Sequence, residues 1–417
     1  MQGFLHHTET ATEVAGRVGE KLIKRDASVH AFRDFDLGRL LAGAKELDRR
    51  PHSLRGPLHG LIIAVKEVFD VEQLRCTWGL SALHGRVPTE DANIVIKLKQ
   101  LGALVAGTTI STELAIARAG PTRNPLNFEL TPGGSSSGSA AAVAAGIVPI
   151  AIGSQTIGSI VRPAAFCGVI GFKPTRQLLN TGGMMSLAPP LDHVGLIGSN
   201  IRDLHFVVHY LADIPYIPLP ENNSRVSKVL LTTPDTRYPL EPAMAVALQS
   251  FVQRLTHMSI CVSQLRLPLT FSAAFLLAQT IVAYNIARSH CDLLERHKDS
   301  VSCQLLSLLK RGQQISDIEY QMAVEKCEAV TREIGRQMDD ETIIVSPATD
   351  GLIPQWHRDH TGSPLYQALW TITGMPVISM PISRTKGLPL SVQLIAAQHC
   401  DPILLTFANR IEAIVRA

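Results

Sequence analysis

The chain has 417 residues, of which 46% are hydrophobic and 18% charged, and its formal net charge is +3. This composition excludes an intrinsically disordered chain, because such chains combine few apolar residues with a high net charge. The lysines and arginines are scattered rather than grouped in a basic block, so we expect neither nucleic acid nor an anionic membrane surface as a partner.

The sequence also lacks features typical of secreted and membrane proteins. The N-terminal residues MQGFLHHTETATEV contain no basic segment followed by an apolar one. The longest apolar run, 140–152, is interrupted by Gly146 and Pro149 and is shorter than the roughly 20 residues that span a bilayer. The seven cysteines form no CxxC pair, which predicts neither a disulfide framework nor a zinc cluster. We therefore predict a cytoplasmic protein.

In chain order, helical and strand patterns alternate. Apolar residues at helical spacing predict helices over 10–25, 37–49, 92–101, 201–212, 241–255, 271–296, 317–338 and 401–415. Short β-rich runs predict strands at 61–65, 103–107, 228–232, 342–346 and 389–396. This alternation predicts an α/β fold whose large, mixed and mostly parallel central sheet is covered by helices on both faces. The proline-rich stretch 214–225 is the best linker candidate, but the same pattern resumes after it, so we predict one domain over 1–417.

Lys66 is unusual because it follows the apolar strand LIIAV at 61–65. A lysine at a strand end commonly extends its ammonium into solvent. Burial of an ammonium is costly unless the group is paired or deprotonated. A buried and neutral lysine can instead serve as the base that activates a serine.

A serine cluster, TPGGSSSGSAAAVAAG, covers 131–146. Most glycine–serine runs are loops or helix starts. The segment GSSSG also matches the GxSxG motif of esterases, with Ser136 as the nucleophile, but that motif needs a preceding strand and FELTPGG stands there instead. A phosphate-binding loop would need a lysine after the glycines, and none follows.

A second polar segment, GSQTIGSIVRPAAFCG at 153–168, follows an apolar run. A glycine–serine turn after a strand is commonly just a turn. Such a turn can also point successive backbone N–H groups at an anion, which is how an oxyanion hole is built. Ser159 lies in this turn, and Arg162 follows three residues later. A guanidinium suits recognition of a planar carboxylate, although Arg162 could instead pair with an internal acid.

The order of these three motifs, first the lysine, then the serine cluster and then the turn, resembles that of the amidase signature family. Further segments match it: SLAPPLDHVG at 186–195, LWTITGMPVISMP at 369–381 and GLPLSVQLIA at 387–396. The resemblance covers most of the chain, with the core motifs at about 60–200, and implies one α/β/α domain around a large mixed sheet. It also implies a Ser–cis-Ser–Lys triad with Ser159 as nucleophile, Ser135 as bridging serine and Lys66 as base, without metal or organic cofactor.

The resemblance assigns roles to neighbouring residues as well. The backbone N–H groups of Thr156, Ile157, Gly158 and Ser159 are expected to hold the oxyanion. Gly134 and Ser136 are expected to contact substrate, while Ser136 and Ser137 hold the turn and cap the helix that begins near Gly138. Ile157 departs from the family, which has a small residue there. A β-branched residue disfavours positive φ, so this position must be extended or helical, and it either narrows the acyl pocket or distorts the oxyanion hole.

The form QTxGSxxRPAA resembles the malonamidase branch, in which the arginine matching Arg162 binds a carboxylate. We therefore predict an amidohydrolase that releases ammonia from a small amide bearing a carboxylate, and a homodimer by the same resemblance. A non-catalytic relative and a partner-dependent, A-type component of an amidotransferase stay open, as does the esterase with its GxSxG elbow. The polar loop at 356–362 is interpreted as pocket-lining or solvated rather than metal-binding, and the pair Asp192–His193 as structural.

Overall fold

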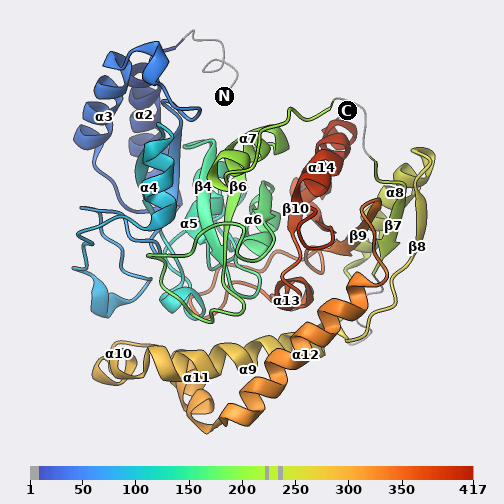
Figure 1. Cartoon of the computed structure of the whole chain (residues 1–417). Coiled ribbons are helices and arrows are strands. Elements are labelled where there is room, and N and C mark those ends of the chain that lie inside the picture. The colour runs from blue at the N-terminus through green and yellow to red at the C-terminus, as the bar shows by residue number, and fades with distance from the viewer. Residues whose placement is uncertain (1–8, 221–224, 233–237, 417) are drawn as a thin grey trace.

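The computed structural model of the chain describes residues 9–220, 225–232 and 238–416. In this described part, eleven strands form one sheet in the order β1-β3-β2-β4-β6-β5-β10-β11-β9-β7-β8 (Figure 1). The strands are β1 Phe32–Asp34, β2 Ile62–Lys66, β3 Leu104–Thr109, β4 Ile150–Gln155, β5 Ile170–Lys173, β6 His193–Gly198, β7 Lys228–Leu231, β8 Cys261–Gln264, β9 Thr342–Pro347, β10 Val377–Thr385 and β11 Leu388–Ile395. The prediction of a single α/β domain around a large mixed sheet is confirmed.

The helices agree with the predicted ones to within a few residues at most positions. They are α2 Ala11–Val29, α3 Leu37–Arg49, α4 Asn93–Gln100, α5 Ser137–Ala144, α6 Val161–Cys167, α7 Ile201–Leu211, α8 Pro242–His257, α9 Phe271–Ser289, α10 Cys291–Arg296, α11 Cys303–Gln314, α12 Asp317–Gly335, α13 Leu365–Ile372 and α14 Asp401–Arg416, with short 3-10 turns at His52–Leu54, Ser81–Leu83 and Glu113–Ala115. The predicted helix over 271–296 is two helices, α9 and α10, which meet at His290. No helix among the described residues combines the length and apolarity needed to cross a membrane. Part of the linker candidate, 221–224, lies outside the described residues, as does 233–237, which follows β7.

The prediction that the sheet is mostly parallel is wrong. Six of its strand pairs are antiparallel and four are parallel in the described structure. Parallel pairing is confined to β3-β2-β4 and β9-β7-β8, where helices connect the strands. The segment expected as one strand at 389–396 pairs with β10 through a two-residue turn, Lys386–Gly387, in which both φ angles are positive. Such a turn matches the twist of a hairpin and forces the strands to run antiparallel.

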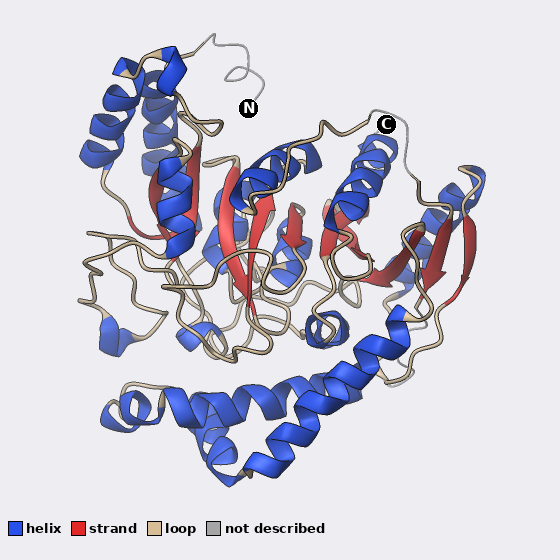
Figure 2. Ribbon diagram, in the orientation of Figure 1, coloured by secondary structure: helices blue, strands red, loops and turns tan. Residues whose placement is uncertain are grey.

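The two faces of the sheet bury different helices, as the two-residue period of a strand requires. On β2, Ile62 and Ala64 lie in the core cluster that contains residues of α2, α3, α5 and α6. Ile63 and Val65 lie in the larger cluster that contains residues of α4, α7 and α14. Figure 2 shows these helices in front of and behind the red strands. The expected cover of helices on both faces is confirmed.

A further layer of helices crosses one end of the strands. In Figure 1 the gold and orange helices α9, α11 and α12 run along the lower edge of the view. The helix α11, which was not predicted, packs so closely on α9 that a Cβ built on Gly312 would lie 1.9 Å from the carbonyl oxygen of Ala283. Since no side chain fits there, glycine is required at that crossing.

A similar close approach at the start of α5 leads to a prediction about stability. A Cβ at Gly138 would lie 2.1 Å from the carbonyl oxygen of Ala31 and 2.5 Å from the backbone nitrogen of Ile110. Because both are backbone atoms of the packed core, Gly138→Ala should destabilise the fold by about 1–3 kcal/mol. Gly16→Ala in α2 is the matched control, because nothing lies within 4 Å of its built Cβ. The control should gain about 0.5–1 kcal/mol from helix propensity. Urea unfolding followed by circular dichroism measures both, and equal midpoints would contradict this account of the packing.

Candidate active site

Lys66 is the last residue of β2 and shares a side of the strand with Ile62 and Ala64. Its side chain is completely buried, and its Nζ donates to Ser135 Oγ at 2.8 Å and to Ser154 Oγ at 2.9 Å. Within the described residues it forms no ion pair. Loss of hydration therefore dominates and lowers its pKa to about 7. The lysine is thus held between two hydroxyl groups and is readily deprotonated near neutral pH.

Glu67, the next residue, points away from this site, as the alternation along a strand predicts. Its carboxylate accepts from Arg33 Nε at 3.0 Å and from the Ser111 backbone N–H at 2.8 Å, as well as from Thr77. Glu67 is therefore neutralised by its own partners. Its negative charge still raises the pKa of Lys66, but by less than desolvation lowers it.

The serine cluster supplies the second hydroxyl of the site. Ser135 is 3% exposed, and the peptide bond between Gly134 and Ser135 is cis, as the resemblance implied. The carbonyl oxygen of Ser135 accepts from the Thr112 N–H at 3.3 Å, and its Oγ accepts from Lys66. The predicted pair of Lys66 and Ser135 is therefore in direct contact.

Ser159 lies in the turn between β4 and α6 and is 9% exposed. Its carbonyl oxygen accepts from the Ser136 N–H at 3.3 Å, which attaches the turn to the serine cluster. The structure thus brings the two polar segments together around Lys66.

The backbone N–H groups of residues 156–159 have no hydrogen-bond acceptor among the described residues. The next two N–H groups, of Ile160 and Val161, donate to Gln155 Oε1 at 2.8 and 3.1 Å. Unpaired N–H groups in a buried turn are rare and attract an anionic oxygen. The arrangement is suited to binding a developing oxyanion.

Ile157 adopts the conformation that its β-branched side chain requires. Its φ is not positive, and its side chain is buried in the large core cluster. Its carbonyl oxygen accepts from Thr371 Oγ1 at 2.6 Å, which holds the middle of the turn. Gly158 has little room, since a Cβ there would lie 2.8 Å from Gln367 Oε1.

The hydroxyls of the two serines that follow Ser135 both donate to backbone carbonyl oxygens. Ser137 Oγ donates to the carbonyl oxygen of Gly133 at 2.7 Å, so the expectation that it holds the turn is confirmed. The expectation that Ser136 caps the helix with its side chain is wrong, because its Oγ donates to the carbonyl oxygen of Ser154 at 3.1 Å instead. Ser136 is fully buried and no strand precedes it in residues 125–135, so the geometry of an esterase nucleophile elbow is not present. The predicted contact between Ser136 and substrate is not supported by its hydroxyl, which is engaged with Ser154.

Arg162, in the first turn of α6, is a buried cation. Its Nη2 donates to the carbonyl oxygen of Gly134 at 2.7 Å and to Thr361 Oγ1 at 3.2 Å. Its Nε and Nη1 have no partner in the described structure, and no acidic residue there pairs with it. Burial lowers its pKa to about 10, which leaves it protonated at neutral pH. Among the described residues, therefore, no internal acid neutralises Arg162.

Sequence reasoning missed several residues of the site. Ser154 faces Lys66 from β4, and Thr371 of α13 receives a hydrogen bond from Gln155 Nε2 at 2.9 Å. Ser154 could have been noticed as a serine that follows an apolar run in the sequence. Its contact with Lys66 could not be inferred, because that contact requires β4 to lie beside β2. A second buried lysine, Lys173, was also missed. Its Nζ donates to the carbonyl oxygen of Met375 at 2.6 Å and to no serine hydroxyl among the described residues, which sets it apart from Lys66.

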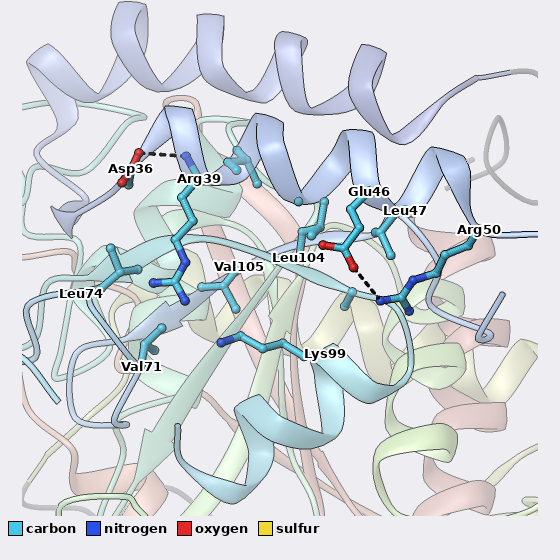
Figure 3. A pocket seen from close by; sticks show the side chains of 13 residues that line it. Asp36, Arg39, Glu46, Leu47, Arg50, Val71, Leu74, Lys99, Leu104 and Val105 are labelled. Atoms are coloured by element: carbon cyan, nitrogen blue, oxygen red, sulfur yellow. Dashed lines mark hydrogen bonds and ion pairs between the residues drawn. The ribbon is translucent and has the colours of Figure 1, made fainter. Parts of the chain in front are cut away.

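Several cavities in the described structure lie outside the group of serines, and two of them are close to the N-terminal half of the sheet. One of about 230 Å³ adjoins residues 111–113 and is lined by polar side chains, among them Arg33, Arg118 and Glu113. Another of about 300 Å³ lies between α3 and α4, where Arg39 and Lys99 extend toward the same space above an apolar floor (Figure 3). None of the predicted site residues lines the second cavity among the residues described.

The loop at 356–362 carries its two histidines at the surface. The ring of His357 stacks on that of His360 with centroids 5.4 Å apart, and both residues are exposed. No group of three potential metal ligands occurs in the described residues. The loop contributes to the serine site through Thr361, which accepts a hydrogen bond from Arg162.

Comparison with known proteins agrees with this geometry. The sequence model of the Amidase family matches residues 17–405. The chain is 27% identical to the A-subunit of Glutamyl-tRNA(Gln) amidotransferase from Lysinibacillus sphaericus, over 94% of this chain and 91% of that protein. A solved amidase has a TM-score of 0.89 and 26% identity over 99% of this chain and 98% of that one. The peptide amidase of Stenotrophomonas maltophilia shares the fold, with a TM-score of 0.83 and 24% identity over 100% of this chain and 96% of that one. We conclude that the chain belongs to the Amidase family and is an amide-hydrolysing enzyme.

Proposed function

We propose that Ser159 attacks the carbonyl carbon of a small carboxylic amide and that Ser135 and Lys66 remove its proton. The observation that carries this proposal is the buried lysine whose Nζ lies 2.8 Å from Ser135 Oγ and has no acidic partner in the described structure. A base of this kind must be neutral at working pH, and the lowered pKa of Lys66 meets that requirement.

The reaction then runs in two halves. The Ser159 Oγ–carbon bond forms while the hydroxyl proton passes through Ser135 to Lys66, and the N–H groups of 156–159 bind the oxyanion. The C–N bond breaks as the proton returns through Ser135 to the nitrogen, which leaves as ammonia. Water, deprotonated along the same route, then cleaves the acyl-enzyme to carboxylic acid and free Ser159.

We further propose that the substrate carries a carboxylate close to the amide, as in malonamate. The support is Arg162, three residues beyond Ser159, which has two unpaired N–H-bearing nitrogens and no acidic partner among the described residues. A buried guanidinium with free donors is strongly stabilised by a planar carboxylate. Arg162 also donates to the carbonyl oxygen of Gly134, so this cation is fixed next to Ser135. Ile157, buried beside the turn, would narrow the acyl pocket and favour small acyl groups.

A second candidate function comes from the relatives. The chain matches proteins named as the A-subunit of Glutamyl-tRNA(Gln) amidotransferase over 94–97% of its length. A component of that type would depend on partner chains, whereas a free-standing amidase would not.

The purified single chain should release ammonia from malonamate, malonamide or small aliphatic amides if the first proposal is right. Activity with glutamine alone, and only after partner chains are added, would favour the amidotransferase. Homodimerisation and a cytoplasmic location stay predictions.

Substitution of the three proposed catalytic residues tests the triad. Ser159→Ala should abolish turnover, because the acyl-enzyme cannot form. Ser135→Ala and Lys66→Ala should each lower kcat by at least about a thousandfold, and the double variant should be little worse, since residues that act as a unit are not additive. Ammonia release measures the rates. A substantially active Ser159→Ala enzyme would exclude this mechanism, and an acyl adduct trapped on Ser136 would favour an esterase.

The pH dependence of kcat/KM tests the identity of the base. Because burial lowers the pKa of Lys66 to about 7, the neutral base forms as the pH rises through that value. The acidic limb of kcat/KM should therefore have an apparent pKa near 7, with activity lost below it. Lys66→Arg should stay inactive over the whole range, since arginine remains protonated. An active arginine variant with an unchanged limb would remove Lys66 from this role.

Paired substrates test the role of Arg162. Arg162→Ala should lower kcat/KM for malonamate by a factor that corresponds to about 2–4 kcal/mol of lost transition-state stabilisation, because a buried charge-assisted contact is lost. Malonamide, which has a neutral amide in place of the carboxylate, should lose much less. Arg162→Lys should recover part of the loss, since an ammonium lacks the planar fork. Equal losses for the two substrates would make Arg162 structural and refute the carboxylate proposal, while the triad would stand.

A further inference from the structure

Asp192, which directly precedes β6, has a buried carboxylate with four hydrogen bonds. Its Oδ1 accepts from Thr156 Oγ1 at 2.7 Å. Its Oδ2 accepts from Ser186 Oγ at 2.9 Å and from the backbone N–H groups of Leu187 at 2.9 Å and Ala188 at 3.0 Å. The carboxylate therefore joins the turn that carries Ser159 to a loop from a different part of the chain.

All four partners of Asp192 donate, which is the pattern that an ionised carboxylate requires. Two of them are backbone N–H groups, which cannot accept a proton from a carboxylic acid. Burial raises the pKa of Asp192, and the hydrogen bonds from Thr156 and the 186–188 loop reduce that rise without abolishing it. A buried charge with this many fixed donors is rigid, because any displacement leaves the charge unpaired.

Asp192 contacts the turn at Thr156, the residue of the turn that lies next to β4. Thr156 carries the first of the unpaired N–H groups of 156–159, and its own side chain is the group that Asp192 holds. The other supports act further along, since Thr371 holds the carbonyl oxygen of Ile157 and Gln155 holds the N–H groups that follow Ser159. The end of the turn next to β4 thus depends on Asp192.

We propose that Asp192 is a positioning residue that aims the N–H donors of the turn 156–159 at the oxyanion through Thr156. The proposal rests on the proposed function of this turn. Preorganised donors lose most of their value when they move by about half an ångström, so the orientation of Thr156 should appear in kcat. The loop on the other side of Asp192 is itself anchored, because the carbonyl oxygen of Ser186 lies 2.7 Å from His290 Nε2 at the junction of α9 and α10.

The hydroxyl of Thr156 can be removed without removing the carboxylate. Thr156→Val should lower kcat for malonamide about 10- to 100-fold while KM stays within about twofold, since the loss concerns the transition state. Thr156→Ser keeps the hydroxyl and should restore most of kcat. Enzyme concentrations are normalised to the folded fraction, measured by circular dichroism.

Thr175→Val is the matched control. Like Thr156, Thr175 is a buried threonine whose hydroxyl donates to a buried carboxylate, here that of Asp401. Its backbone N–H donates to the same carboxylate. Neither residue contacts the turn 156–159. Its loss should reduce stability to a similar degree and leave kcat unchanged. If Thr156→Val and Thr175→Val both reduce stability and neither changes kcat, Asp192 is a structural residue and the proposal is wrong.

A pH profile separates the charge of Asp192 from its hydrogen bond. The charged groups that act on Lys66 are Glu67 and Asp192, which raise its pKa, and Arg162, which lowers it. Asp192→Asn removes one negative charge, so the acidic limb of kcat/KM should move to lower pH, together with the fall in kcat. Thr156→Val keeps the carboxylate and should leave the limb in place. Should Asp192→Asn fail to fold, the comparison of Thr156→Val, Thr156→Ser and Thr175→Val still decides the question.

Failure of this proposal can be distinguished from failure of the proposed function. Ser159→Ala is assayed in parallel with the variants above. If Ser159→Ala stays active, the turn 156–159 does not carry the nucleophile, and both the proposed function and this inference are refuted. If it is inactive while Thr156→Val has normal kcat, the function stands and the role of Asp192 is refuted.

Discussion

The burial of the Lys66 amine at the end of β2, without an acidic partner among the described residues, is the constraint on which the rest of the site depends. Lys66 is fully buried and has two serine hydroxyls as its partners. Removal from water favours the neutral amine, and the low local dielectric prevents distant charges from being screened. The site therefore needs a fold that excludes water from Lys66 without offering it a carboxylate. The sheet meets that need, since the neighbouring acid, Glu67, points to the other side and is paired with Arg33.

Arg162 is a second buried basic side chain without an acidic partner in the described structure. Arg162 keeps two unpaired donor nitrogens next to the serines, whereas Lys173 satisfies its ammonium with backbone carbonyls. Desolvation of an uncompensated charge is costly, so such groups persist where a ligand repays the cost. The three buried basic side chains thus differ in their partners: Lys66 contacts serine hydroxyls, Arg162 keeps two unpaired donor nitrogens, and Lys173 contacts backbone carbonyls.

The sequence determined the outline of the fold and was enough to propose the three residues of the triad. Long amphipathic segments such as α3 and α7 were predicted nearly to the residue, because one face is buried and the other solvated. Helices α6 and α13 were not among the helices predicted from apolar spacing, since both are short and all their residues are buried, so neither shows a solvated face. Lys66 was conspicuous because it follows an apolar strand, whereas Ser135 and Ser159 were named because the order of the three motifs resembles the amidase signature family.

What the tertiary structure alone decided concerns contacts between segments distant in sequence. The neighbours of each strand, and hence Ser154 beside Lys66, follow from sheet order, which local patterns do not encode. The same holds for Asp192 on Thr156, 36 residues apart, and for the absence of an acid at Arg162 in the described structure. Local sequence sets the backbone preferences and the chemistry of each side chain, whereas pairing, desolvation and pKa depend on which remote groups the packed fold brings within a few ångströms.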